Sequence, residues 1–241
     1  MTIHHEIHGQ GAPLLLGFPL LASAWPGDPE LAVLKGYLDR LTDRYRVLVV
    51  DYPNLAPGVG KSDPVPGGDL TADRACSDLL AVADAAGFER FAFWGYSWGG
   101  VVGLQLACRT DRLTALVCGG WPPLGGPYGD MLRITRRMAA APEVPVRVDQ
   151  FVTFYESVQG WPEAEAVKRI ACPRMTFIGA ADEMEYPGEI QLRIAATIRE
   201  RRRELEHLGW QVTEIPGRDH GVFTDPATVV PIVREFLDRA I

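Results

Sequence analysis

The chain has 241 residues, of which 47% are hydrophobic and 23% are charged. Its 31 acidic residues outnumber the 24 Lys and Arg, and the formal net charge of −7 argues against a nucleic-acid or anionic-membrane binder, which needs a basic face. This composition is typical of a globular protein that buries a core, and the length allows either two small domains or one larger α/β domain.

Short apolar runs alternate along the chain with longer segments of helical periodicity. The expected strands are Thr2 to His8, Leu14 to Gly17, Arg46 to Asp51, Phe91 to Trp94, Leu113 to Cys118, Met175 to Ile178 and Trp210 to Ile215. The expected helices are Pro29 to Leu41, Leu70 to Ala86, Trp98 to Arg109, Gly188 to Leu208 and Pro226 to Ala240. Gly9-Gln10-Gly11 is expected to form a hairpin turn between the first two strands. The alternation predicts an α/β fold with a mostly parallel central sheet and helices on both faces.

One stretch, residues 119–165, interrupts this alternation. It begins with Gly, Pro and aromatic residues and continues with two amphipathic segments at about Asp130 to Ala141 and Val146 to Val158. Because both of its ends join strands of the sheet, we expect a small helical cap inserted into a single domain that spans residues 1–241.

The run from Ala12 to Trp25 resembles a secretory signal, but no Lys or Arg precedes it, and Gly17 and Pro19 interrupt it. We therefore expect a buried strand followed by a loop. No apolar run approaches the ~18 residues that span a bilayer. The cysteines form no C-x-x-C pair, which predicts buried free thiols and a cytoplasmic protein. They are Cys76, Cys108, Cys118 and Cys172.

The segment Gly95-Tyr96-Ser97-Trp98-Gly99 places G-x-S-x-G between an expected strand and an expected helix. The glycines permit a sharp turn under backbone strain, where a Cβ atom two residues before or after the serine would collide. Ser97 is therefore the candidate nucleophile. A serine hydroxyl needs a general base, which a carboxylate orients.

Among the five histidines, only His220 lies in a glycine-flanked loop between the last strand and the last helix, and it is the expected base. Asp182 follows an expected strand and would lie at the carboxyl edge of the sheet, where open α/β folds carry their sites. It is the preferred acid. Asp219 and Glu183 are rivals, although adjacency to the histidine should direct the Asp219 side chain elsewhere.

These motifs resemble the α/β-hydrolase superfamily over nearly the whole chain, in the order Ser, Asp, His. The matching segments are Leu14 to Pro19, Gly58-x-Gly60-x-Ser62, Gly95 to Gly99, Phe177 to Asp182 and Gly217 to His220. The resemblance implies that the backbone N–H groups of Phe18 and Trp98 form an oxyanion hole.

Three other groups of residues have competing interpretations. His4, His5 and His8 suggest a metal, but strand alternation places adjacent histidines on opposite faces, and no metal site is expected. Arg133, Arg136 and Arg137 could bind a substrate anion or form a solvated helix face. Large apolar residues of the expected cap could line a pocket or pack on the body. They are Trp121, Tyr128, Met131, Met138, Phe151, Phe154, Tyr155 and Trp161.

The sequence predicts a serine hydrolase that cleaves a carboxylic ester, lactone or thioester of a small apolar molecule through an acyl-enzyme on Ser97. We expect no cofactor, and no nucleic-acid or membrane partner. Two alternatives stay open. A lyase, cyclase or perhydrolase could use the same triad, and a ligand-binding pseudoenzyme could retain the pocket without turnover.

Overall fold

The computed structural model describes residues 3–18, 29–52, 61–63, 68–141 and 148–241. The strands are β1 (His5–His8), β2 (Ala12–Gly17), β3 (Tyr45–Val50), β4 (Phe91–Tyr96), β5 (Leu113–Gly119), β6 (Arg174–Gly179), β7 (Met184–Tyr186), β8 (Ile190–Leu192) and β9 (Trp210–Ile215). The helices are α2 (Pro29–Leu41), α3 (Ala72–Ala85), α4 (Trp98–Ala107), α5 (Tyr128–Ala139), α6 (Val148–Ser157), α7 (Glu163–Val167), α8 (Ile194–Glu200), α9 (Arg202–His207), the short 3₁₀ helix η1 (His220–Thr224) and α10 (Pro226–Ala240). Three expected features lie outside the described residues: the start of the first strand at Thr2, the loop from Pro19 to Trp25, and the loop Gly58 to Gly60.

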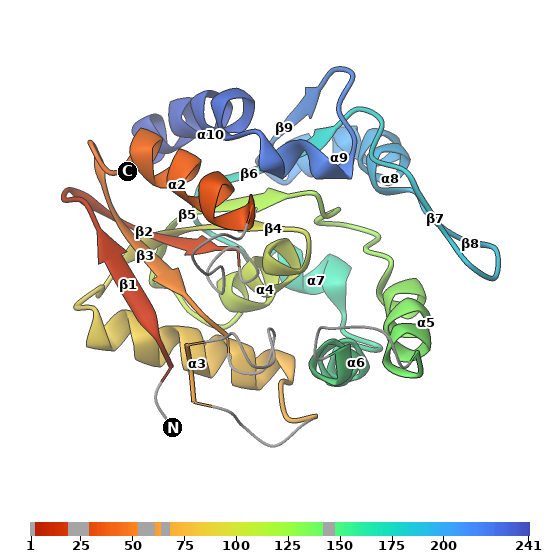
Figure 1. The fold of residues 1–241 in the computed structure, drawn as a ribbon. Helices are drawn as coiled ribbons and strands as arrows, with labels where there is room; N and C mark the ends of the chain where they lie inside the picture. The colour runs from red at the N-terminus through yellow and green to blue at the C-terminus, as the bar shows by residue number, and fades with distance from the viewer. Residues whose placement is uncertain (1–2, 19–28, 53–60, 64–67, 142–147) are drawn as a thin grey trace.

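The large sheet has the strand order β1-β3-β2-β4-β5-β6-β9 (Figure 1). Only β1 is antiparallel to its neighbour in this sheet, and the other five pairings are parallel. The expected α/β fold with a mostly parallel sheet is confirmed. Among the helices of the described residues, none has the length and hydrophobicity to cross a bilayer.

Helices pack on both faces of the sheet because successive side chains of each strand point to opposite sides. On β2, Leu15 joins the apolar cluster formed with α3 and α4, while Leu14 and Leu16 join the cluster formed with α2 and α10. The central strand β4 is buried along its whole length. Continuous burial of this kind explains why the strands have apolar runs rather than alternating sequences.

The predicted hairpin at residues 9–11 is wrong, because β3 lies between β1 and β2. The connection between β1 and β2 crosses the amino-terminal end of β3, where the N–H of Ala12 donates to the carbonyl oxygen of Arg44 at 3.3 Å. Gly11 has φ of +116°, and a Cβ there would lie 2.0 Å from the same carbonyl oxygen. The glycine therefore serves a close crossing of two backbone segments instead of a two-strand turn.

The predicted helix from Gly188 to Leu208 is wrong in its first part, where β7 and β8 form an antiparallel hairpin. The helical region begins at Ile194 and divides into α8 and α9. Pro187-Gly188 forms the end of the hairpin, with Gly188 at φ of +81°. Pro followed by a residue of positive φ is a β-turn signal, which here outweighs the helical periodicity of the residues that follow.

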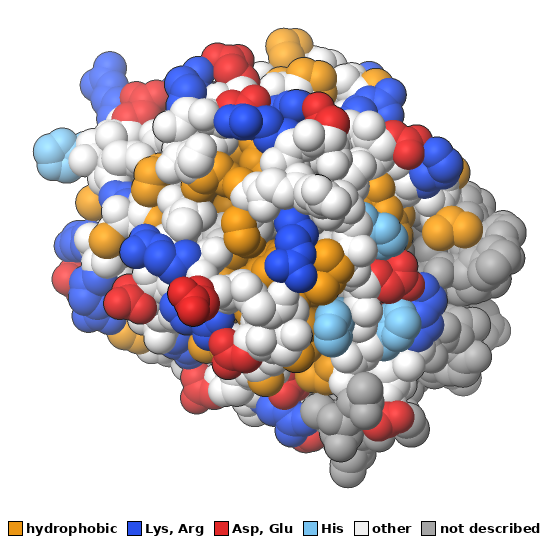
Figure 2. Space-filling view, turned by 90° about the vertical axis from the view of Figure 1, so that its left-hand side faces the viewer, with side chains coloured by type: hydrophobic (Ala, Val, Ile, Leu, Met, Phe, Trp, Pro, Cys, Tyr) orange, Lys and Arg blue, Asp and Glu red, His pale blue; other side chains and the backbone are white. Residues whose placement is uncertain are grey.

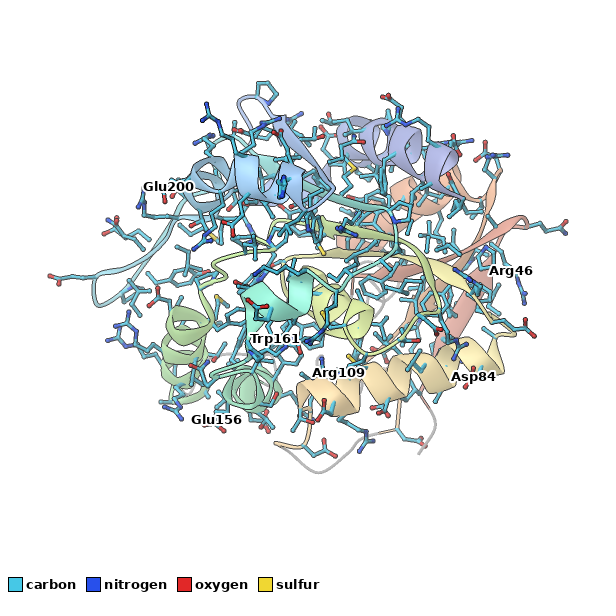
Figure 3. The ribbon with its side chains drawn as sticks, turned by 180° about the vertical axis from the view of Figure 1, so that it is seen from behind. Arg46, Asp84, Arg109, Glu156, Trp161 and Glu200 are labelled. Carbon is cyan, nitrogen blue, oxygen red and sulfur yellow. The ribbon has the colours of Figure 1, made fainter. Side chains whose placement is uncertain are left out.

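Residues 120–173 connect β5 to β6 and carry α5, α6 and α7, which include the two helices that the amphipathic segments predicted and a third, short one. Residues 142–147, where the second helix was expected to begin, are outside the described part of the chain. Arg136 on α5 forms an ion pair with Glu156 on α6 at 2.7 Å, and Glu156 is labelled in Figure 3. This ion pair joins the exposed sides of the two helices.

The four cysteines differ in burial. Cys76 and Cys118 are buried free thiols as predicted, whereas Cys108 and Cys172 are half-buried.

The amino-terminal histidines form part of a charged cluster at the edge strand, and Figure 2 shows histidine side chains beside acidic and basic ones on that face. His4 and His8 lie 3.1 and 3.2 Å from the Glu6 carboxylate, while His5 is directed to the Ile3 carbonyl oxygen. Lys61 donates to Glu6 at 2.6 Å and thereby lowers the pKa of that carboxyl to about 2.

The crossing at Gly11 can be tested against a second glycine of positive φ. Gly11→Ala should lower the free energy of unfolding by about 3 kcal/mol or more, because it adds a backbone collision to the cost of an unfavourable φ. Gly87→Ala, at φ of +70° with open space around the Cβ, should cost only about 1 kcal/mol. Urea unfolding of both variants measures the difference, and equal losses would show that the collision at Gly11 relaxes freely.

Candidate active site

Ser97 lies at the turn between β4 and α4 and has an unusual backbone conformation. Its φ is 53° and its ψ is −119°, a region that costs a non-glycine residue about 1–3 kcal/mol. A Cβ at Gly95 would lie 2.1 Å from the carbonyl oxygen of Gly99, so the turn requires glycine there. The N–H of Ser97 donates to the carbonyl oxygen of Gly119 at the end of β5, at 2.8 Å. This bond fixes the strained residue at the carboxyl edge of the sheet.

The structure brings His220 to Ser97. His220 begins η1, after the end of β9, and its Nε2 lies 3.0 Å from Ser97 Oγ. The His220 side chain is 23% exposed, so the imidazole has solvent on one side and the serine on another. A hydroxyl and an imidazole at this distance can exchange a proton.

Asp182 completes the arrangement from the loop after β6. Its carboxylate oxygens lie 3.1 and 3.0 Å from His220 Nδ1, and the side chain is fully buried. The two loops are joined by the N–H of Ala181, which donates to the carbonyl oxygen of Arg218 at 2.8 Å. Because an ionised carboxylate only accepts hydrogen bonds, this contact favours the tautomer that carries a proton on Nδ1 and leaves Nε2 to accept from Ser97.

The two rival carboxylates have other partners. Asp219 accepts a hydrogen bond from the N–H of Gly221 at 2.9 Å and caps η1, as expected for a side chain directed away from the histidine. Glu183 accepts from the N–H of Ala196 at 2.9 Å, at the start of α8. Both bonds satisfy backbone donors at helix amino termini, which is the usual role of an acidic residue there. Of the three carboxylates, Asp182 is the one that contacts His220.

Tyr96 is a site residue that the sequence analysis did not single out. Its hydroxyl donates to the carbonyl oxygen of His220 at 2.7 Å, and its ring centroid lies 5.3 Å from the imidazole. Burial raises the pKa of this phenol, so the donor stays protonated. The available signal was its place immediately before Ser97 in the G-x-S-x-G segment. Tyr96 thus fixes the backbone that carries the histidine.

Phe18 and Trp98 are the residues expected to form the oxyanion hole. Phe18 lies far before Ser97 in the chain, and Trp98 directly follows it. Trp98 is the first residue of α4, so its N–H is one of the four at a helix start that lack a partner inside the helix. Phe18 follows β2, and its ring packs against Tyr37, Trp94 and Tyr96 with centroid separations of 5.0, 5.6 and 6.4 Å. Both side chains are buried and line the same cavity as Ser97.

A cavity of about 370 Å³ opens at Ser97 and His220. From the body it is lined by Phe18, Tyr96, Ser97, Trp98, His220 and Phe223. From α5, α6 and the β7–β8 hairpin it is lined by Met131, Ile134, Thr135, Met138, Val148, Phe151, Tyr155 and Tyr186. This volume is near the lower end of the range for small-molecule sites, and most of the lining is apolar or aromatic.

The large apolar residues between β5 and β6 divide into two groups. Met131, Met138, Phe151 and Tyr155 line the cavity. Trp121, Tyr128, Phe154 and Trp161 pack against neighbouring rings instead. The Phe154 side chain is fully buried, with its ring 5.1 Å from that of Trp98. The two interpretations of these residues are therefore each right for half of them.

The arginines of α5 have intramolecular partners. Arg133 pairs with Asp130, Arg136 pairs with Glu156, and Arg137 donates to the carbonyl oxygen of Pro187. None of the three lines the cavity. Their contacts support the structural interpretation over binding of a substrate anion. Across the described ranges, no group of three or more His, Cys, Asp and Glu is arranged to hold a metal ion.

The model of the family described as "Alpha/beta hydrolase family" matches residues 7–232 of this chain. Among curated proteins, "Putative carbamate hydrolase RutD" of Azorhizobium caulinodans is 29% identical over 149 residues, which cover 60% of this chain and 52% of that relative. The protein of the same name from Klebsiella pneumoniae subsp. pneumoniae is 24% identical over an alignment that covers 90% of this chain and 94% of that relative. The match to the Azorhizobium protein thus spans about half of that relative.

Solved structures share the fold over almost the whole chain. A thermophilic esterase from Thermogutta terrifontis has a TM-score of 0.70 at 21% identity, covering 99% of this chain and 93% of the esterase. An enol-lactonase from Burkholderia xenovorans has a TM-score of 0.65 at 18% identity, covering 98% of this chain and 96% of the lactonase. At these sequence identities, the similarity to the two structures shows a shared fold.

Proposed function

Since the chain belongs to the alpha/beta hydrolase family, we propose that it is a serine hydrolase that forms an acyl-enzyme on Ser97. The observation that carries this proposal is the continuous contact from Ser97 Oγ through His220 to the buried Asp182, at 3.0 Å on each side of the imidazole. The order of the three residues and their strand-end positions support the same chemistry.

In the proposed reaction, His220 Nε2 removes the proton of Ser97 as Oγ attacks the carbonyl carbon of the substrate. Asp182 holds the proton on Nδ1 and stabilises the imidazolium that forms. The N–H groups of Trp98 and Phe18 donate to the oxyanion of the tetrahedral intermediate. His220 then protonates the leaving group, and the bond from the carbonyl carbon to that group breaks. A water activated by His220 releases the acid and regenerates Ser97.

We propose a carboxylic ester, lactone or thioester of a small, mainly apolar molecule as the substrate class. The cavity volume of about 370 Å³ and the aromatic lining support this choice, because burial of apolar acyl groups supplies binding energy. A carbamate is the second candidate, favoured by the name of the curated relatives. Its carbonyl would be attacked by the same serine, although its nitrogen makes that carbon less electrophilic.

The decisive experiment compares p-nitrophenyl acetate and butyrate with the corresponding p-nitrophenyl N-methylcarbamate. Each kcat/KM is divided by the uncatalysed hydrolysis rate of the same substrate. A larger ratio for the esters supports the first substrate class, and a larger ratio for the carbamate supports the second. Product analysis on lactones and thioesters separates hydrolysis from lyase, cyclase or perhydrolase chemistry. Absence of turnover on every substrate, together with ligand binding, would identify the pseudoenzyme instead.

Ser97→Ala should remove nearly all esterase activity while the protein stays folded. The residual rate should not exceed about 10³ to 10⁴ times the uncatalysed rate, which is the level that an oxyanion hole and binding sustain without a triad. Mass spectrometry after treatment with a fluorophosphonate should locate the adduct on Ser97. Labelling of Ser62 with Ser97 unmodified would contradict the assignment.

Asp182→Asn should lower kcat by about 10⁴, because the amide loses the charge and the orientation that the imidazole requires. Asp219→Asn is the matched control, since that carboxylate caps η1 and does not touch the ring. Its loss should stay within about tenfold, measured under the same conditions. Similar losses at both positions, with unchanged circular dichroism spectra, would show that Asp182 is not the acid.

Variants at Phe151 and Phe154 distinguish a side chain that lines the substrate cavity from one that packs in the core. Phe151→Ala enlarges the cavity and should change the preference between acetyl and longer acyl esters by about 1–3 kcal/mol. Phe154→Ala should instead lower the free energy of unfolding by about 3–5 kcal/mol, because it empties a fully buried site. Chain-length profiles and urea unfolding of both variants measure the two effects. An unaltered acyl profile in Phe151→Ala would leave substrate choice to the loops around Phe18 and Trp98.

A further inference from the structure

The short 3₁₀ helix η1 carries His220 at its first position and Phe223 at its fourth, and both residues line the cavity. In a 3₁₀ helix, residues three apart lie on the same side, because one turn takes three residues. The backbone carbonyl oxygens of His220 and Phe223 each accept a hydrogen bond from a buried tyrosine outside η1. The segment that carries the candidate base is thus held by the body of the protein at two points.

The first donor is Tyr96 at the end of β4, whose hydroxyl lies 2.7 Å from the His220 carbonyl oxygen. Two glycines at the end of β5 make room for its ring. A Cβ at Gly119 would lie 2.5 Å from Tyr96 Cδ2, and a Cβ at Gly120 would lie 2.6 Å from Tyr96 Cζ. Because only glycine lacks a Cβ, both positions permit the ring to lie where its hydroxyl reaches η1.

The second donor is Tyr37 of α2, whose hydroxyl lies 2.7 Å from the Phe223 carbonyl oxygen. Tyr37 is fully buried and is not among the described residues that line the cavity. The residue before it, Gly36, permits a close approach of α2 to α10, since a Cβ there would lie 2.9 Å from the ring of Pro226. Figure 1 shows α2 beside α10, which begins two residues after η1 ends. Gly36 and Tyr37 thus combine the close approach with the donor that uses it.

The rings of the two tyrosines also contact the residue expected on the oxyanion side. The ring centroid of Tyr37 lies 5.0 Å from that of Phe18, and the ring centroid of Tyr96 lies 6.4 Å from it. Tyr96 is also 5.1 Å from the ring of Phe223. Burial raises the pKa of both phenols, so both remain protonated donors. One group of packed rings therefore joins Phe18 to η1.

Two donors do more than one for a helix as short as η1, which has five residues. A single hydrogen bond leaves such a helix able to turn about that bond, whereas two bonds on one side fix its rotation as well as its position. Rotation of η1 would change the distance of 3.0 Å between His220 Nε2 and Ser97 Oγ. Since a displacement of about 1 Å can lower a rate by about 100-fold, the second donor has a consequence for the reaction.

We propose that Tyr37 is a positioning residue of the active site, which acts together with Tyr96 by holding η1 at Phe223 and His220. This inference rests on the proposed function and extends its machinery to a buried side chain outside the cavity. The hydroxyl of Tyr37 acts on the base through the backbone of η1, so its loss should affect the chemical step more than substrate binding.

Tyr37→Phe should lower kcat on p-nitrophenyl butyrate by about tenfold while KM stays within about threefold, because the cavity lining is unchanged. Tyr45→Phe is the matched control. The Tyr45 side chain is also buried, and its hydroxyl donates to Asp238 from the amino-terminal end of β3, at the opposite edge of the sheet from Ser97. The control should lower the melting temperature and keep kcat within about twofold. A wild-type kcat in Tyr37→Phe, with only the melting temperature lowered, overturns the proposal.

The double variant tests whether the two tyrosines hold the same element. Tyr96→Phe should lower kcat by about tenfold or more. Residues that act on one helix are not independent, so Tyr37→Phe combined with Tyr96→Phe should lower kcat by a factor that differs at least threefold from the product of the two single factors. A factor equal to that product means that the two residues act separately and refutes a joint hold.

Hydrogen–deuterium exchange of the peptide that spans residues 218–225 measures the hold without turnover. Exchange should be at least tenfold faster in Tyr37→Phe than in the wild-type protein and unchanged in Tyr45→Phe. Unchanged exchange in Tyr37→Phe overturns the proposal, because η1 then keeps its place without the second donor. Hydrolysis by the wild-type protein with an unaltered kcat in Tyr37→Phe refutes this inference alone. Faster exchange in Tyr37→Phe, without hydrolysis of any ester by the wild-type protein, supports the hold on η1 and refutes the proposed function.

Discussion

Parallel pairing of the central strands is the constraint on which the site depends, because it brings the carboxyl ends of β4, β6 and β9 to one edge of the sheet. Ser97, Asp182 and His220 each follow one of these ends. Their separations in the chain, 38 residues between Asp182 and His220 and 123 between Ser97 and His220, have no influence on the contact distances. The parallel strands bring the three residues to this edge, and hydrogen bonds of the loops, from Ala181 to Arg218 and from Tyr96 to His220, hold them there.

Two unfavourable features are concentrated at this edge. Ser97 has a strained backbone, and Asp182 carries a carboxylate with no exposure to solvent. Neither would persist without compensation, since a strained residue or an isolated buried charge lowers the stability of the fold. The bond from Ser97 to Gly119 and the paired contacts from Asp182 to His220 supply it. The surrounding sheet therefore stabilises a geometry that local preferences disfavour.

The wall over the site is built from two separate parts of the chain. The segment between β5 and β6 supplies most of the apolar lining, and the β7–β8 hairpin, which directly follows Asp182, supplies Tyr186. Arg137 of α5 joins these parts through the carbonyl oxygen of Pro187 and does not enter the cavity. The shape of the cavity is thus linked to contacts that lie outside the reacting groups.

The sequence by itself determined the parallel α/β class and the contact partners Ser97, Asp182 and His220, because the strand ends and the G-x-S-x-G turn are local features with strong steric requirements. It could not give the position of β1 next to β3, since neighbours in the chain need not be neighbours in a sheet. It also missed the β7–β8 hairpin, where a turn at Pro187-Gly188 competed with helical periodicity. Whether Phe151 or Phe154 lines the cavity depended on packing between distant segments, and only the tertiary structure decided it.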